Sequence, residues 1–282
     1  MTYKLLDDGS VVPGFVMLSK SGEIDSGIGG SVSTLQQDML SHPGYYPAAK
    51  QFRIFSTRIN IGNAKEDLWD GPTDRYVFPV AEQQMRVISS NAADSSAGTG
   101  ARKLLIEYLD SSFNELYEVI VLNGTTPVLT SATNIFRINR VRSIEVGTNG
   151  YPVGNISLQN TAGNVTYAYQ AVGKNIASQC AVTVPQNKNA YISWWSVSSG
   201  AATSGHITDV GIFSTVVDGV KYPGVFTCDR AVMLQDQAIC ASLQIPIMYP
   251  PGTDVLITAI SDASAANATA FCEIDGWLEQ IS

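Results

Sequence analysis

The sequence predicts an all-β protein in which β-sandwich or jelly-roll domains follow an extended N-terminal arm. Beyond about residue 51, short runs of β-branched and aromatic residues are bounded by Gly, Pro, Asn or Asp. Such runs at spacings of about 8 to 12 residues are typical of sandwiches and jelly rolls. Amphipathic helical patterns are nearly absent, and the first fifty residues show neither kind of pattern.

The expected arm comprises residues 1–50, where Gly, Ser and Pro recur from Gly9 to Pro47 without a sustained apolar period. A segment of this kind cannot bury its own large apolar side chains. The arm is therefore either disordered or laid across a neighbouring surface; we expect the second arrangement and a role in assembly. The side chains that would anchor it are Phe15, Val16, Met17, Leu18, Tyr45 and Tyr46.

The first expected sandwich domain spans residues 51–162. Lys103–Leu109 and Tyr117–Leu122 alternate apolar and polar residues on either side of a polar loop, which predicts a β-hairpin. Asn123-Gly124 favours the positive φ values of a type I′ turn, so we expect a second hairpin with Thr125–Leu129. The best helical candidate is Thr130–Val141, whose apolar residues stand at near-helical spacing.

The second expected domain, a jelly-roll-like sandwich, spans residues 163–282. Its boundary follows the composition change at Gln159–Gly163. Asp218-Gly219 predicts a hairpin between Ile212–Val217 and Val220–Phe226. A single large sandwich that uses both blocks is the alternative. Four other runs have the length and composition of strands: Ala190–Val197, Leu243–Met248, Val255–Ile260 and Ala270–Leu278.

The surface is expected to be polar but weakly charged. Only 15% of the 282 residues are charged, the apolar content is 45% and the net charge is −8. A hydroxyl or amide surface is easier to desolvate against a neighbour than a charged one, which favours assembly. The acidic balance argues against direct nucleic-acid binding. No apolar run reaches the roughly 20 residues of a membrane helix, and residues 1–10 lack a signal peptide's pattern, so we expect no membrane partner.

Residues that carry chemistry are few. The two histidines, His42 and His206, have no partner pattern, and no Gly-x-Ser-x-Gly sequence occurs. The cysteines lie in apolar, strand-like contexts and are expected to be buried free thiols, with a disulfide or metal role as the alternative. They are Cys180, Cys228, Cys240 and Cys272.

Carboxylates form two groups that could work in pairs, as the acids of glycosidases do. The interpretation we favour is that they are turn and solvent-facing residues. The Asp110–Glu118 stretch resembles a calcium loop but lacks its required Gly and terminal Glu. We therefore predict no catalytic, cofactor-binding or metal-binding residue, no cofactor and no enzymatic activity. The two groups are Asp67, Asp70 and Asp74 around Trp69, and Asp110, Glu115 and Glu118 around the first hairpin.

Trp194-Trp195 is expected to place one indole in the core and the other at a surface, because side chains alternate along a strand. An aromatic platform for sugar is the alternative, with Tyr167-Ala168-Tyr169 as a second candidate.

Two stretches resemble virion structural proteins of tailed bacteriophages. One runs from Leu68-Trp69-Asp70-Gly71-Pro72 to Pro127-Val128, and the other is Val182–Trp194, with its Val-Pro-x-x-Lys-x-Ala-Tyr-Ile pattern. The resemblance implies a capsid-decoration, cement or head-fibre-type protein, most simply a homotrimer, that contacts the major capsid protein or other virion proteins. It would be made in the bacterial host cytoplasm and carried in the virion. A tail fibre, adaptor or receptor-binding component that contacts host glycan is the alternative, and a virion glycan depolymerase using the two acidic groups is a third.

Overall fold

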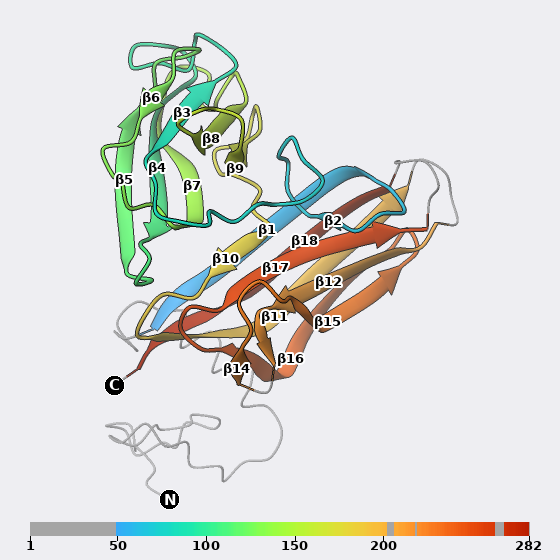
Figure 1. Cartoon of the computed structure of the whole chain (residues 1–282). Helices are drawn as coiled ribbons and strands as arrows, with labels where there is room; N and C mark the ends of the chain where they lie inside the picture. The colour runs from blue at the N-terminus through green and yellow to red at the C-terminus, as the bar shows by residue number, and fades with distance from the viewer. Residues whose placement is uncertain (1–48, 202–205, 218, 263–267, 282) are drawn as a thin grey trace, which may run out of the picture. The chain divides into compact units, whose positions relative to one another are not determined.

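The computed structural model describes residues 49–201, 206–217, 219–262 and 268–281, and contains strands but no helix within them. The protein is therefore all-β, as predicted. Two separate hydrophobic cores organise these strands. We call the part built on residues 49–79 and 178–281 the sandwich and the part built on residues 80–177 the inserted lobe (Figure 1). The expected arm, apart from its last two residues, lies outside the described residues.

Two antiparallel sheets face each other in the sandwich. The first has the order β1-β18-β11-β16 and the second β10-β17-β12-β15, with β2 also paired to β17. Between β1 and β18 the chain passes back and forth between the two sheets, so neighbouring strands are far apart in sequence. The strands are β1 (Ala49–Ile61), β2 (Glu66–Asp67), β10 (Ala181–Thr183), β11 (Lys188–Ala201), β12 (Thr208–Ser214), β15 (Thr227–Leu234), β16 (Ala238–Tyr249), β17 (Asp254–Ser261) and β18 (Ala268–Gln280).

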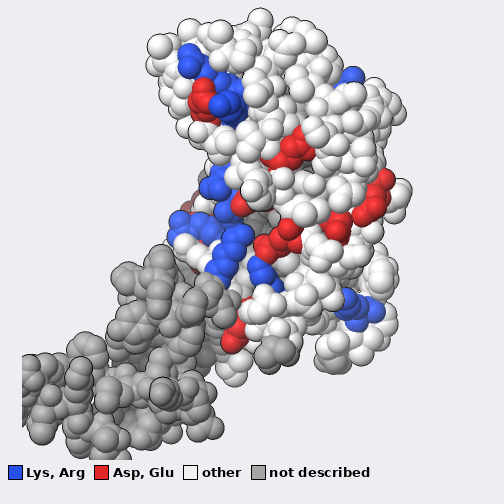
Figure 2. All heavy atoms as spheres, turned by 90° about the vertical axis from the view of Figure 1, so that its left-hand side faces the viewer, with Lys and Arg blue, Asp and Glu red and all other residues white. Residues whose placement is uncertain are grey.

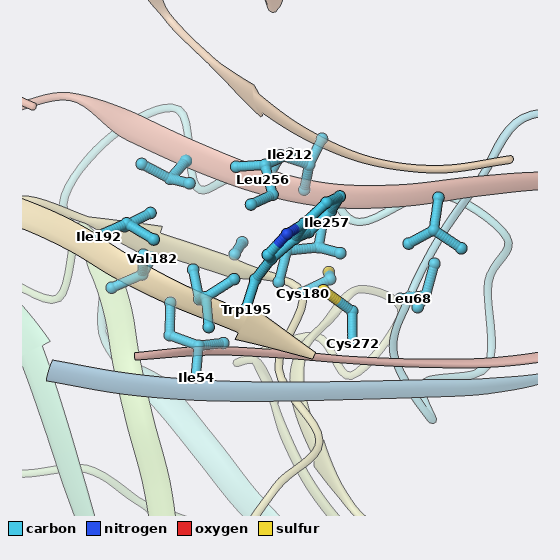
Figure 3. Close-up of a cluster of buried hydrophobic side chains, with 14 of the residues drawn as sticks. Ile54, Leu68, Cys180, Val182, Ile192, Trp195, Ile212, Leu256, Ile257 and Cys272 are labelled. Atoms are coloured by element: carbon cyan, nitrogen blue, oxygen red, sulfur yellow. The ribbon is translucent and has the colours of Figure 1, made fainter. Parts of the chain in front are cut away.

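The sandwich core lies between these sheets because alternate residues of each strand point inward. Ile192 and Ile257 are 0% exposed, and Trp195 is 3% exposed (Figure 3). Each large side chain buried in this way contributes about 1.5–3 kcal/mol to folding. Leu68 joins the same core, which fixes the connection that follows β1 against the second sheet.

The inserted lobe consists of a four-stranded sheet, β6-β3-β8-β9, and a three-stranded sheet, β5-β4-β7, around its own core. Leu104, Ile106 and Ile135 are 0% exposed there. The strands are β3 (Met85–Ser89), β4 (Ala101–Leu109), β5 (Glu115–Val121), β6 (Val128–Leu129), β7 (Arg137–Val146), β8 (Ile156–Asn160) and β9 (Thr166–Gln170).

Several predicted strands and turns are confirmed. β4 and β5 form the expected hairpin in regular register, from Lys103 opposite Val121 to Leu109 opposite Glu115. The four further strand runs lie within β11, β16, β17 and β18. The hairpin across Gly219 is present but short, since β13 (Val216–Val217) and β14 (Val220–Lys221) make only two residue pairs.

Two local predictions are wrong. Thr130–Val141 is not helical; it is a connection that leads into β7. A register shift between Glu107 and Tyr108 lets Ile138 and Val141, three residues apart, both face the core, which gives a strand an apparent helical spacing. Gly124 does adopt φ 60°, but β6 pairs with β3 and not with β5, so no second hairpin forms there.

The cores also divide the chain differently from the expected boundary between residues 162 and 163. That boundary falls inside the β8–β9 hairpin, whose strands share the inserted lobe's core. β1, from the first expected block, pairs along its length with β18, the last strand of the chain. Pairing between strands more than two hundred residues apart leaves no local sequence signal.

Candidate functional site

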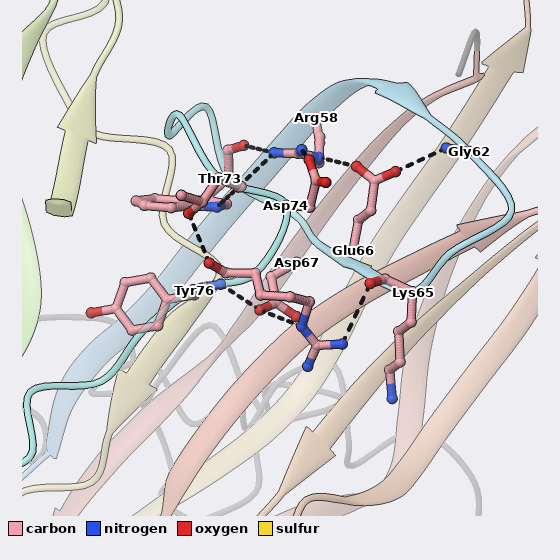
Figure 4. Close-up of polar contacts among 10 residues, drawn as sticks. Arg58, Gly62, Lys65, Glu66, Asp67, Thr73, Asp74 and Tyr76 are labelled. Carbon is pink, nitrogen blue, oxygen red and sulfur yellow. Dashed lines mark hydrogen bonds and ion pairs between the residues drawn. The ribbon is translucent and has the colours of Figure 1, made fainter. Parts of the chain in front are cut away.

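Arg58 organises the acidic group around Trp69 (Figure 4). Its guanidinium forms ion pairs with Glu66 and Asp74 and also donates to the carbonyl oxygens of Trp69 and Thr73, at 3.3 and 3.2 Å. The Arg58 side chain is only 11% exposed. These four partners of one largely buried cation hold the loop that follows β1 in a fixed conformation.

The other two carboxylates of this group have separate partners. Asp67 accepts hydrogen bonds from the Tyr76 N–H at 2.6 Å and from Arg75 at 3.2 Å, while Asp70 pairs with Lys174 at 2.5 Å. Burial raises the pKa of Asp67, although those hydrogen bonds oppose the shift. Asp67, Asp70 and Asp74 each pair with a different cation, namely Arg75, Lys174 and Arg58, so all three have partners within the same chain.

The second acidic group is also engaged. Asp110 accepts the N–H groups of Ser112 and Asn114, both at 2.9 Å, and so closes the β4–β5 loop. Burial alone would raise the pKa of Asp110, but the hydrogen bond from the Asn114 side-chain amide, together with these two backbone hydrogen bonds, lowers it below its ordinary value. Glu118 accepts the N–H groups of residues 131 and 132, at 2.6 and 3.0 Å.

Glu115, the remaining member of that group, pairs with Lys50 and Lys188, which belong to the sandwich. Burial would raise the pKa of Glu115, but the two lysines lower it. This carboxylate therefore ties the β4–β5 hairpin to the sandwich.

A buried ion pair joins the inserted lobe to the sandwich, and no sequence pattern indicated it. Arg137 on β7 meets Asp254 on β17 through two hydrogen bonds of 2.9 and 3.1 Å, and both side chains are 13% exposed. The Thr183 hydroxyl donates to the same carboxylate, and the guanidinium lies 4.0 Å from the Phe136 ring centroid. Two residues 117 positions apart form no local motif, so only tertiary structure could reveal them.

His206 and the cysteines lie apart from these groups. His206 contacts Asp262 at 2.9 Å, and the same carboxylate accepts the N–H of Ile207; His42 lies outside the described residues. Cys180 and Cys272 are buried as predicted, whereas Cys228 and Cys240 are exposed. The prediction was wrong for these two because they lie on β15 and β16, the edge strands of the two sheets.

The aromatic predictions have mixed outcomes. Trp195 enters the core and Trp194 does not, as expected from alternation. Tyr167 is 7% exposed and Tyr169 packs against the sandwich core, so this pair offers no open platform. A partly exposed aromatic pair that the sequence analysis missed is formed by Tyr191 and Trp277, stacked at 5.1 Å across β11 and β18.

Two strands, β5 and β16, each carry more than one strongly exposed apolar side chain. On β5, Tyr117, Val119 and Val121 are 75, 45 and 46% exposed, and we call these three side chains the β5 stripe. β16 carries Ile245 and Met248, which are 84 and 48% exposed. Contiguous apolar surface is a feature of interaction sites, so these strands are the strongest candidates for a functional surface.

Within the residues that the structure describes, no helix has the length and apolarity to span a membrane.

No protein-family model and no curated protein matches this chain. Solved structures that match include a chain of infectious bursal disease virus, Gt strain. It is 9% identical, with 88% of this chain and 82% of that chain covered and a TM-score of 0.19. A chain of the Gx strain is also 9% identical, with 83 and 77% covered and a TM-score of 0.21. A chain of the VP2 subviral particle of the same virus is 10% identical, with 83 and 77% covered and a TM-score of 0.19. TM-scores this low carry no argument about the fold or function of this chain.

Proposed function

We propose that this chain is a structural protein of a virus particle and, more specifically, a capsid-decoration, cement or head-fibre-type protein of a tailed bacteriophage. The observation that carries the proposal is the strand order of the sandwich. We interpret β1-β18-β11-β16 facing β10-β17-β12-β15 as a jelly roll, because the eight strands are distributed over the two sheets in that fold's order, with β12 and β15 as consecutive strands of one sheet. Jelly rolls occur in viral capsid proteins, and also in lectins and cupins.

The character of the surface and of the polar side chains separates these classes, since a fold by itself does not specify a function. The carboxylates of both acidic groups already hold backbone N–H groups or cations of the same chain. Charged residues make up only 15% of the sequence, and apolar side chains are exposed along strands. These features favour association over chemistry.

Counting copies in purified particles tests the proposal. Quantitative mass spectrometry of the particles should give hundreds of copies of this chain for a decoration or cement protein. About a dozen copies would favour the tail, and absence from the particles would refute a virion role altogether.

The tail position is the second candidate. A fibre, adaptor or receptor-binding component would use exposed aromatic side chains against host glycan, and Trp194, Tyr191 and Trp277 lie on strands of the same sheet. Glycan-array binding that is lost in Trp194→Ala would favour this alternative. Binding by neither the wild type nor the variant would favour the head.

We propose that the chain is not an enzyme and that it acts as a homotrimer. Incubation with host polysaccharide should release no product, with or without a chelator, and light scattering should report an oligomer at micromolar concentration. Release of sugar, or a strict monomer, would contradict these expectations.

The N-terminal segment is proposed to attach the protein to its particle. Deletion of residues 1–48 should leave the strands folded and weaken attachment to the particle. The large apolar side chains of this segment would each contribute about 1.5–3 kcal/mol when fully buried against a partner. A truncated protein that attaches normally would show that the segment is passive.

A further inference from the structure

An unpaired strand edge exposes backbone N–H and C=O groups to which another chain can add a strand. Three edge strands of the sandwich, β1, β15 and β16, are covered or irregular. β1 receives hydrogen bonds from the 178–179 segment, for example from the Gln179 N–H to the Phe55 oxygen at 3.2 Å. β15 has a register shift at Asp229, whose carboxylate accepts the Tyr249 hydroxyl at 2.7 Å, and β16 has a register shift that includes Pro246. Bulges, inward charges and proline all discourage strand addition.

Most edges of the inserted lobe are also short, irregular or covered. β6 has two residues and the β8–β9 pair is shifted. β7 is covered by residues 175–177, with the Ser143 N–H donating to Asn175 at 2.8 Å. β5 is different among the described edges, since its seven residues run in unbroken register with β4 and lie at the rim of the lobe (Figure 1).

The direction of the β5 backbone groups follows from antiparallel geometry. The Asp110 N–H donates to Asn114 and the Leu122 N–H donates to Arg102, at the two ends of the hairpin. Hydrogen-bonded pairs alternate along an antiparallel ladder, so even-numbered residues of β5 face β4. The N–H and C=O groups of Tyr117, Val119 and Val121 therefore point away from β4, and these are the residues whose side chains form the β5 stripe.

The charge of the surroundings indicates the partner. The stripe itself is uncharged, and nearby charged side chains on the same sheet already pair with each other, Lys103 with Glu145 at 2.7 Å and Glu107 with Arg140 at 3.6 Å. Figure 2, which faces this side of the molecule, shows charged atoms in small groups separated by uncharged surface. A neutral partner with matching apolar side chains fits such an edge better than a charged one.

We propose that β5 pairs with β5 of a second copy of this chain, antiparallel about a two-fold axis at Val119. This inference deepens the proposed self-association and rests on it. The stripe is self-complementary in this register, because Tyr117 stands opposite Val121 of the second copy and Val119 opposite Val119. Aromatic and β-branched cross-strand pairs of this kind are favourable. Glu118 then stands opposite Ile120 of the other copy, so no two like charges meet.

The β5–β5 contact is isologous, so it joins copies in pairs. If three copies associate through another surface, the β5 contact joins two trimers. In either case, Val119→Lys should halve the mass measured by light scattering at micromolar concentration. Val172→Lys is the matched control, because Val172 is 53% exposed and lies outside the stripe. An unchanged mass for Val119→Lys would overturn the proposal.

Val119→Pro tests the backbone contribution separately. Proline removes an N–H that points away from β4, so the hairpin should keep its hydrogen bonds while the contact between copies is lost. Circular dichroism should match the wild type, and the mass should halve. A variant with native dichroism and full mass would show that the edge is not used.

Cross-linking tests the register. In a chain carrying Cys228→Ser and Cys240→Ser, Val119→Cys should form a disulfide-linked dimer under mild oxidation, because hydrogen-bonded pairs place Cα atoms about 5.5 Å apart. Val172→Cys should not. Equal cross-linking of the two variants would refute the register. Failure of the β5 contact leaves the copy number in particles unaffected, so it can be distinguished from failure of the proposed function.

Discussion

Arg137→Met is the most informative single change, because it removes one partner from the buried ion pair between the inserted lobe and the sandwich. The Asp254 side chain is 13% exposed in the wild type, and in the variant its carboxylate would keep the Thr183 hydroxyl as a donor. Removing one partner of such a pair costs about 3–5 kcal/mol, because the other charge stays buried. That is a large share of the roughly 5–15 kcal/mol that stabilises a typical protein.

A double-mutant cycle with Asp254→Asn separates the pair's interaction from other effects. Asp254→Asn leaves Arg137 with the carbonyl oxygens of Pro79 and Phe136, at 2.8 and 3.1 Å, so its cost should lie at the lower end of that range. The double variant should lose less unfolding free energy than the sum of the losses in the two single variants, with a coupling energy of about 0.5–3 kcal/mol.

Urea unfolding monitored by two probes provides the measurement. All four tryptophans, at positions 69, 194, 195 and 277, belong to the sandwich, so their fluorescence reports on that part, whereas far-ultraviolet circular dichroism reports on both. The two transitions should coincide in the wild type and separate in Arg137→Met.

Lys103→Met is the control, since the Lys103–Glu145 pair is 42% exposed on both sides and should contribute less than about 1 kcal/mol. If Arg137→Met cost no more than this control, or if the cycle were additive, the ion pair would not couple the two parts.

Three further outcomes are expected. Gly276→Ala should destabilise the protein by about 1–3 kcal/mol, because a Cβ there would lie 1.7 Å from a backbone oxygen of β11. Gly200→Ala should be nearly neutral in the same thermal-unfolding assay, because nothing lies within 4 Å of its added Cβ. Burial raises the pKa of Asp67 in the folded protein. The stability that Asp67 contributes is therefore fully present below its pKa in the unfolded chain, about 3.9, and is lost as the pH rises through its higher pKa in the folded protein. In a pH series of urea titrations, Asp67→Asn should therefore reduce the decrease in the free energy of unfolding with rising pH. The same pH dependence in the variant would contradict the raised pKa of Asp67. Cys228 and Cys240 should react with Ellman's reagent in the folded protein and the two buried thiols only in urea; rapid reaction of all four would contradict the burial.

The candidate surface was only partly predictable. The alternation in Tyr117–Leu122 predicted the β4–β5 hairpin, and with it the set of side chains that forms the β5 stripe. The sequence could not indicate that β5 would be an edge strand, because the turn at Gly124 suggested a further partner on its open side. The carboxylates were expected to be turn and solvent-facing residues, but Asp67 is 0% exposed, and partners such as Lys174 for Asp70 are remote in sequence.

The sequence by itself determined the all-β class, the positions of most strands and the inward face of each, since these depend on alternation and turn residues that act over a few positions. Tertiary structure decided which strands pair and where the cores divide. β1 pairs with β18 and the inserted lobe interrupts the sandwich, because strand pairing is selected by the burial of whole faces, to which residues far apart in the chain contribute together. The same reason explains why the Arg137–Asp254 pair and the open edge of β5 became visible only in the folded protein.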